Sequence, residues 1–258
     1  MPDIVLTEKS GQIVTITLHR PEVLNALSLE ALTGLNEALA AADHDADVRA
    51  VVLAGSGNAF TGGWDLHEAV SLDESRLSDA IDAFQAITRT LRHIGTPVIA
   101  AIDGYAIGGG VEMICACDLR IASHRSSFGC PEVSIGVTMT NGAASLLARV
   151  VGEGNAREIV LLGDVIDAAE AHRIGLVNRV VDSGSLLDTA NEMAGRIASR
   201  APLAVQLSKR LMDQMQQDEL ERALELETET IHRALATNDA REGITAFVEK
   251  RPARFEGR

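Results

Sequence analysis

Three consecutive glycines follow an apolar run near the middle of the chain. Residues 97–102, Pro-Val-Ile-Ala-Ala-Ile, are typical of a buried strand, and the Asp-Gly pair after them indicates a turn. Residues 108–112, Gly-Gly-Gly-Val-Glu, then lead into apolar residues 113–116, which predict a short buried helix. Glycines let a ligand approach the backbone closely, and the first amides of a helix have no partner within the helix. The segment therefore predicts a strand, a glycine turn and a helix, with free N–H groups that suit a negatively charged group.

Glu112 could act at the same place. It stands three residues beyond Gly109, about one helical turn on, so its carboxylate can reach the same cavity as the free amides. A glycine turn can also serve close packing alone, and a Glu in a first helical turn can simply complement the helix dipole. Short glycine motifs often arise by chance, so this segment alone leaves both interpretations open.

Strands and helices alternate through most of the chain. Beyond the central segment, strands are expected at 4–6, 11–18, 51–54, 118–122 and 176–181, and helices at 28–42, 77–91, 141–150, 154–163 and 168–173. From about residue 184 the pattern is helical only. This order predicts an α/β core over residues 1–183 and a C-terminal helical layer over 184–258, which could cover the core or mediate oligomerisation.

Charge and cysteine content exclude several classes of protein. The chain has 23 Lys and Arg against 37 Asp and Glu, a net charge of −14, which argues against nucleic acid or an anionic membrane as the main partner. Three cysteines, without the spacing of a zinc site, suit a reducing compartment and predict no metal. No secretory signal and no apolar run of membrane-spanning length is visible, so we expect a cytoplasmic protein.

A second glycine turn and a second carboxylate complete the candidate site. Residues 60–66, Phe-Thr-Gly-Gly-Trp-Asp-Leu, follow the strand expected at 51–54, and Pro131 restrains the backbone before Glu132. Two glycine turns can each offer one backbone N–H to a developing oxyanion, and two such donors form an oxyanion hole. Asp65 is expected to cap a helix and not to donate a proton. Spacing alone does not bring these elements together.

Taken in order, these motifs resemble the enoyl-CoA hydratase/isomerase family of the crotonase superfamily, from about Val5 to the C-terminus. The motifs that carry the resemblance are Arg20-Pro21 with Asn25-Ala26-Leu27, residues 60–66, residues 101–112, residues 128–132, and a tail with Phe247 and Glu249-Lys250-Arg251. The resemblance implies a fold of repeated ββα units with a C-terminal helical region that forms trimers, often paired into hexamers. It also implies an acyl-CoA thioester as ligand and no separate cofactor, because coenzyme A is part of the substrate.

The resemblance also assigns roles to residues. It implies that the amides of Gly62 and Gly109 hold the thioester oxygen and that Glu112 and Glu132 carry protons. Substrate contacts are implied for Ala26, Gly62, Gly63, Trp64, Asp65, Leu66, Gly108, Gly109 and Lys250.

The implied activity is hydration of a 2-enoyl-CoA to a 3-hydroxyacyl-CoA, a lyase reaction of fatty-acid β-oxidation. Glu112 would accept a proton from the attacking water, while Glu132 delivers one to the α-carbon. One alternative is a double-bond isomerase of the same family, in which a single acid/base suffices. Another is a non-catalytic acyl-CoA-binding or RNA-binding relative, which the net charge of −14 and the two acids disfavour.

Three places depart from the family pattern or stay open. Trp64 stands where small residues are usual, and could either pack over the CoA arm or narrow the pocket. Residues 139–143, Met-Thr-Asn-Gly-Ala, keep one glycine where the family often has a Pro and paired glycines. Since the resemblance implies that this segment borders the acyl tail, acyl specificity is open. Lys250 and Arg251 could meet CoA phosphates or be solvated charges.

Overall fold

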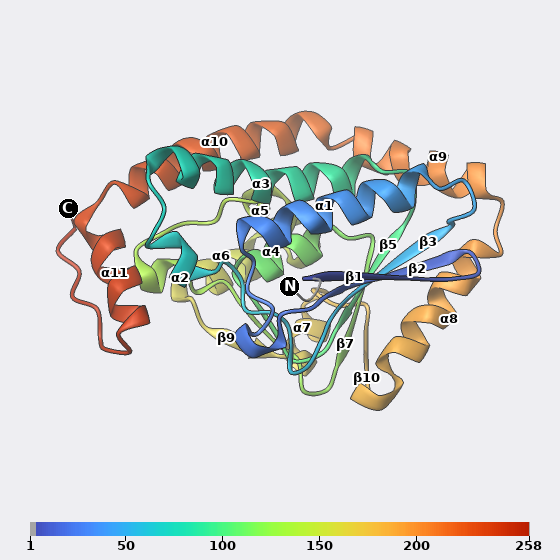
Figure 1. The fold of residues 1–258 in the computed structure, drawn as a ribbon, viewed down its shortest axis with the longest axis horizontal. Coiled ribbons are helices and arrows are strands. Elements are labelled where there is room, and N and C mark those ends of the chain that lie inside the picture. The colour runs from blue at the N-terminus through green and yellow to red at the C-terminus, as the bar shows by residue number, and fades with distance from the viewer. Residues whose placement is uncertain (1–3, 258) are drawn as a thin grey trace.

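Two β-sheets with helices packed around them form the core of the computed structural model, which describes residues 4–257 (Figure 1). The larger sheet has six strands in the order β1-β2-β3-β5-β7-β10. They are β1 (Val5–Ser10), β2 (Ile13–Leu18), β3 (Ala50–Gly55), β5 (Val98–Ile102), β7 (Leu119–Ser123) and β10 (Arg179–Val181). β1 and β2 form an antiparallel hairpin, and all other neighbours pair in parallel. The α/β class is therefore as predicted.

The central strands are buried on both faces, which explains their continuous apolar sequences. Along β3, Val51 and Leu53 point into the larger core, whereas Val52 and Ala54 point into a second cluster on the opposite face. Alternate side chains of a strand face opposite sides of the sheet, so both faces need apolar residues.

Helices cover each face of the larger sheet. α1 (Leu29–His44), α3 (Glu74–His93) and α4 (Gly109–Ala116) pack into the larger core, and α8 (Leu186–Ala198) covers the opposite face through its alanines and Leu186 (Figure 1). The Ser28 hydroxyl caps α1 by accepting a hydrogen bond from the Ala31 amide at 3.2 Å, the cap expected for this residue type. The amphipathic helix predicted over 28–42 is thus confirmed as α1.

A second sheet of four short strands was not expected from the sequence. Its order is β4-β6-β8-β9, and its members are β4 (Ala59–Thr61), β6 (Tyr105–Ile107), β8 (Ser127–Gly129) and β9 (Val165–Asp167). β4, β6 and β8 are parallel, and β9 is antiparallel to β8. Three residues are too few to show an alternating pattern, which is why these strands escaped prediction.

The remaining helices extend from this core. They are α2 (Leu66–Ala69), α5 (Ala143–Val151), α6 (Glu153–Leu162), α7 (Ala168–Arg173), α9 (Pro202–Gln214), α10 (Gln217–Leu235) and α11 (Asn238–Val248), with 3-10 turns η1 (Pro21–Val23), η2 (Pro131–Ile135) and η3 (Ser183–Ser185). α10 packs on α5, and α11 packs on η2. The predicted strand over 176–181 is shorter than expected, since only its last three residues form β10. Within residues 4–257, no helix combines the length and apolar character needed to cross a bilayer.

Candidate active site

The second sheet brings the predicted site residues together. Parallel strands end at a common edge of a sheet, and ligands of α/β proteins commonly bind beyond that edge. β4 is followed by the glycine turn at Gly62, β6 by Gly108 and β8 by Pro131 and Glu132. The Gly108 amide extends the β6–β8 ladder by donating to the Gly129 carbonyl at 2.8 Å. Three segments that lie far apart in the sequence therefore meet at one end of this sheet.

The turn after β6 directs the start of α4 into the site. Gly108 has φ +54° and ψ −120°, and Gly109 is the first residue of α4. A Cβ on Gly109 would lie 2.8 Å from a ring carbon of Phe84, so the turn also permits close packing. Among the described residues, the Gly109 N–H has no hydrogen-bond acceptor. The turn thus combines a packing role with an unpaired amide at the positive end of a helix dipole.

The amide predicted at Gly62 is not available. The Gly62 N–H donates to the Leu24 carbonyl at 2.8 Å, and the next amide, of Gly63, donates to Thr61 Oγ1 at 3.1 Å. The following N–H, of Trp64, has no acceptor among the described residues. A Cβ placed on Gly63 would lie 3.6 Å from the Gly109 nitrogen, so the two glycine turns are adjacent. The predicted turn therefore offers the N–H of Trp64 and not that of Gly62, because Leu24 lies opposite Gly62 in the folded chain.

Glu112 lies on α4 and is buried, with 2% of its surface exposed. Its Oε1 accepts a hydrogen bond from the Thr140 amide at 3.0 Å. Burial raises the pKa of Glu112 well above its usual range, and the charges of Glu132 and Glu227 raise it further. The backbone amides of Thr140 and Asn141 act in the opposite direction and stabilise the charged form.

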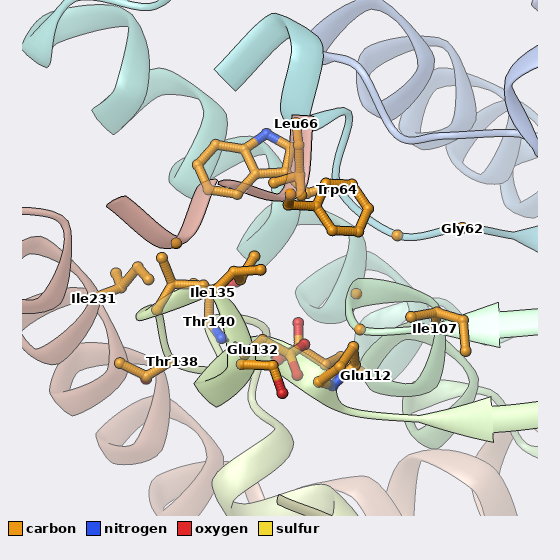
Figure 2. Close-up of a pocket in the computed structure, with 18 of the residues that line it drawn as sticks. Gly62, Trp64, Leu66, Ile107, Glu112, Glu132, Ile135, Thr138, Thr140 and Ile231 are labelled. Carbon is orange, nitrogen blue, oxygen red and sulfur yellow. Dashed lines mark hydrogen bonds between the residues drawn. The ribbon is translucent and has the colours of Figure 1, made fainter. Parts of the chain in front are cut away.

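Glu132, the second carboxyl, lies in the first turn of η2. Its Oε1 would lie 2.9 Å from a Cβ placed on Gly108, so the carboxyl group rests against the glycine turn. Burial raises the pKa of Glu132 to about 7. Figure 2 shows Glu112 and Glu132 side by side, with Trp64 on the opposite side of the pocket. Two neighbouring carboxyls whose pKa values are both raised titrate as a coupled pair, and they can hold a single proton between them near neutral pH.

These groups line a cavity of about 320 Å³ whose walls are mostly apolar (Figure 2). Trp64 packs edge-to-face on Phe84, with ring centroids 6.1 Å apart. The predicted residues that line the cavity are Gly62, Gly63, Trp64, Leu66, Gly108, Gly109, Glu112 and Glu132. Thr140, from the segment expected to border the acyl tail, also lines it. Several others were not anticipated as site residues: Phe84 from α3, Ile135 and Val137 from and after η2, Ile231 from α10, and Gly243 and Ala246 from α11. Apolar spacing had marked Phe84 and Ile231 as helix residues, but it carried no signal for which helix ends reach the cavity.

Three predicted contact residues lie outside the cavity wall. Asp65 caps α2 by accepting from the Glu68 amide, as expected, and its other oxygen pairs with Arg20 at 3.0 Å. The Ala26 carbonyl accepts from the same Arg20 guanidinium at 2.7 Å. Both residues therefore hold the Gly62–Trp64 segment in place through Arg20, outside the cavity wall. Lys250 is exposed.

The tail after α11 also contributes to the cavity wall. Arg251, next to Lys250, lines the cavity and pairs with Glu242 at 2.6 Å. Across residues 4–257, no group of three or more His, Cys, Asp and Glu side chains is arranged to hold a metal ion.

Comparison with known proteins gives consistent matches over nearly the whole chain. Residues 8–258 match the family model described as enoyl-CoA hydratase/isomerase. The chain is 39% identical to the short-chain-enoyl-CoA hydratase of Clostridium acetobutylicum, covering 96% of this chain and 95% of the relative. It is also 39% identical to the crotonyl-CoA hydratase of Syntrophomonas wolfei, covering 97% of each. Among solved structures, an enoyl-CoA hydratase from Mycobacterium avium subsp. paratuberculosis superposes with a TM-score of 0.89 at 28% identity, covering 98% of this chain and 99% of that one.

Proposed function

The chain belongs to the enoyl-CoA hydratase/isomerase family, and on that premise we propose that it adds water to a 2-enoyl-CoA to give a 3-hydroxyacyl-CoA. One observation carries the proposal: the buried carboxyls of Glu112 and Glu132 lie side by side in one apolar cavity, next to two unpaired backbone amides. An isomerase needs only one acid/base, whereas hydration needs one group to accept a proton from water and another to supply one to carbon.

The oxyanion hole is proposed to consist of the amides of Gly109 and Trp64. Attack of water at C3 pushes the electrons of the C2–C3 double bond onto the thioester oxygen, which becomes an enolate oxygen. Unpaired donors that already point to that position stabilise the charge without reorganising. Gly62 is excluded from this role because its amide is already bonded to Leu24.

The proton transfers use the carboxyl pair in its singly protonated form. Glu112 takes a proton from water as the water oxygen bonds to C3, and Glu132 gives its proton to C2 as the enolate collapses. Water is thereby added in full, and the pair again holds one proton. The Thr140 and Asn141 amides favour the ionised Glu112 that this step requires. Addition of both groups from one side of the substrate follows if both carboxyls lie on that side.

Substrate contacts are proposed for the residues that line the cavity. The Gly62–Leu66 segment and Gly108 would border the thioester and the CoA arm, with Trp64 narrowing the pocket against Phe84. Ala26 and Asp65 would act indirectly by holding this segment through Arg20. Lys250 would meet a CoA phosphate only outside the cavity.

Assembly and setting are proposed on the resemblance and on the surface of the chain. We propose a homotrimer or a dimer of trimers, formed by the C-terminal helical layer at 184–258, in the cytoplasm and in fatty-acid β-oxidation. The exposed leucines of α9 support an assembly, because an apolar helix face of this kind usually meets a partner.

The direct test is incubation of the purified protein with crotonyl-CoA. We expect the absorbance of the conjugated enoyl thioester to fall and a product one water heavier to appear by mass spectrometry. No hydration of enoyl-CoA substrates with short or medium chains would contradict the proposal. Conversion of a 3-enoyl-CoA to a 2-enoyl-CoA in the same samples would then identify an isomerase, and salt-sensitive RNA binding would favour a binding protein.

A further inference from the structure

The loop before α5 holds Glu112, and it is itself held from α3. The Thr140 amide donates to Glu112 at 3.0 Å. Gln85 on α3 donates to the Thr140 carbonyl at 3.1 Å, and the Thr88 hydroxyl donates to the Asn141 carbonyl at 2.8 Å. Gln85 and Thr88 are both buried, so these bonds are shielded from water. The loop is therefore part of the machinery that sets the position of Glu112.

A third carboxylate fixes the other end of this loop. Glu227 lies on α10 and exposes 4% of its surface. One of its oxygens accepts from the Gly142 amide at 2.6 Å, and the other accepts from the Ala144 amide at 2.8 Å. These amides belong to the start of α5, where the helix dipole favours negative charge. A carboxylate with both oxygens bonded in this way holds the loop in one orientation.

We propose that Glu227 is a positioning residue for Glu112: its carboxylate fixes residues 140–144 so that the Thr140 amide meets the Glu112 carboxyl group. Glu227 does not line the cavity, so it acts through the loop and not on the substrate. The inference rests on the proposed hydration, because it assigns the loop a part in that reaction.

Glu227 affects the pKa of Glu112 in two opposite directions: its charge raises that pKa, whereas the loop amides that it positions lower it. The charges of Glu132 and Glu227 both raise the pKa of Glu112, in addition to the larger effect of burial. Burial also raises the pKa of Glu227, while the Ala144 and Gly142 amides lower it and favour its charged form. Replacing Glu227 therefore disturbs Glu112 in two ways, by freeing the loop and by removing a neighbouring charge.

Glu227→Gln tests the role with little change of shape. The amide side chain keeps one acceptor oxygen but turns an NH₂ group toward one of the two backbone N–H groups, so one bond is lost. We expect kcat to fall about 10- to 100-fold with KM within about twofold, because a small misplacement of a reacting group affects turnover more than binding. Glu219→Gln is the control: Glu219 lies on the same helix and accepts from Ser145 on α5, but it does not bond the loop amides. An unchanged kcat in Glu227→Gln, or an effect on KM alone, would overturn the proposal.

Three further measurements separate positioning from a loss of stability and from a failure of the proposed activity. In a Glu112→Gln background, adding Glu227→Gln should lower the residual kcat less than about twofold, since the group on which Glu227 acts is already removed; a full additive loss would overturn the proposal.

Amide hydrogen exchange at Thr140 should speed up about tenfold or more in Glu227→Gln and stay unchanged in Glu219→Gln. Exchange does not depend on turnover, so an unchanged Thr140 rate overturns the role of Glu227 even if the protein hydrates no enoyl-CoA. Urea unfolding of each variant shows whether it is folded under the assay conditions.

Discussion

Gly108 has two reasons to be glycine. Its φ of +54° with ψ of −120° is a conformation that residues with side chains rarely adopt. A Cβ would also lie 2.9 Å from Oε1 of Glu132, closer than such contacts normally allow. The same residue therefore shapes the turn toward Gly109 and leaves room for the carboxyl group of Glu132.

Gly108→Ala is expected to lower kcat about 100-fold or more and to destabilise the protein by about 1–3 kcal/mol, through backbone strain and displacement of Glu132. Enoyl-CoA hydration and urea unfolding measure the two effects. Gly154→Ala is the matched control, because Gly154 lies in α6 and a Cβ there meets nothing within 4 Å. Full activity in Gly108→Ala would show that the turn tolerates a side chain.

Residue types in a motif identify a turn, but not which of its amides is free. Gly62 and Trp64 lie two positions apart, and only the contact of Gly62 with Leu24 distinguishes their N–H groups. Leu24 itself has φ +54°, a conformation that nothing in the local residue pattern predicts. The identity of the free donor therefore depends on tertiary structure.

The long periodic helices and strands were predictable from the sequence, and the short strands were not. α1 and the apolar strands β3 and β5 show their periodicity over many residues and were expected at nearly their observed positions. β4, β6 and β8 span three residues each, and they are the strands that bring Gly62, Gly108 and Glu132 to one edge. Part of the cavity lining, including Glu112 and Glu132, could thus be named from the sequence, whereas the convergence of these residues needed the family resemblance or the fold.

The two carboxyls carried by α4 and η2 predict the pH dependence of catalysis. Below about pH 7 the pair takes up a second proton, both carboxyls become neutral and no base remains. At high pH the pair loses its last proton, and no acid remains to protonate C2. We therefore expect kcat/KM to rise with pH through about 7, to reach a plateau and to fall at alkaline pH. A rate that is already maximal at pH 5 would contradict the raised pKa of the pair.

α11 packs closely on η2, so a methyl group added to α11 at Gly243 is expected to disturb catalysis. A Cβ on Gly243 would lie 2.4 Å from the backbone carbonyl of Ile135, in the turn that carries Glu132. Although Ala favours a helix by about 1 kcal/mol over Gly, we expect Gly243→Ala to lower kcat/KM at least about tenfold by displacing η2. Gly195→Ala in α8, where a Cβ meets nothing within 4 Å, should leave the kinetics unchanged. Equal behaviour of the two variants would show that α11 does not position η2.

One face of α9 is exposed and apolar in the single chain. Leu203, Leu207 and Leu211 on α9 expose 64%, 54% and 63% of their surfaces, and Met212 and Met215 lie close by in sequence. Their spacing places the leucines on one side of the helix, facing away from the core. A monomeric protein seldom leaves such a face uncovered, which supports the proposed assembly.

Sedimentation equilibrium tests this directly. The wild-type chain is expected at three or six times the monomer mass, and Leu207→Asp with Leu211→Asp should shift it toward the monomer by placing charges in the contact. Leu187→Asp, at an exposed leucine on α8, provides a comparison on a different helix. A wild-type protein that is monomeric at micromolar concentration would contradict the assembly.

Two buried carboxyls divide the two proton transfers of the proposed hydration, and Glu132→Gln tests this division. The change removes the proton donor while preserving shape, so hydration of crotonyl-CoA should fall about 10²- to 10⁴-fold. Affinity for the saturated analogue butyryl-CoA should stay within about threefold of wild type, because the rest of the cavity wall and the amides of Gly109 and Trp64 are unchanged. Turnover within tenfold of wild type, in a variant that still binds butyryl-CoA, would contradict the two-carboxyl account.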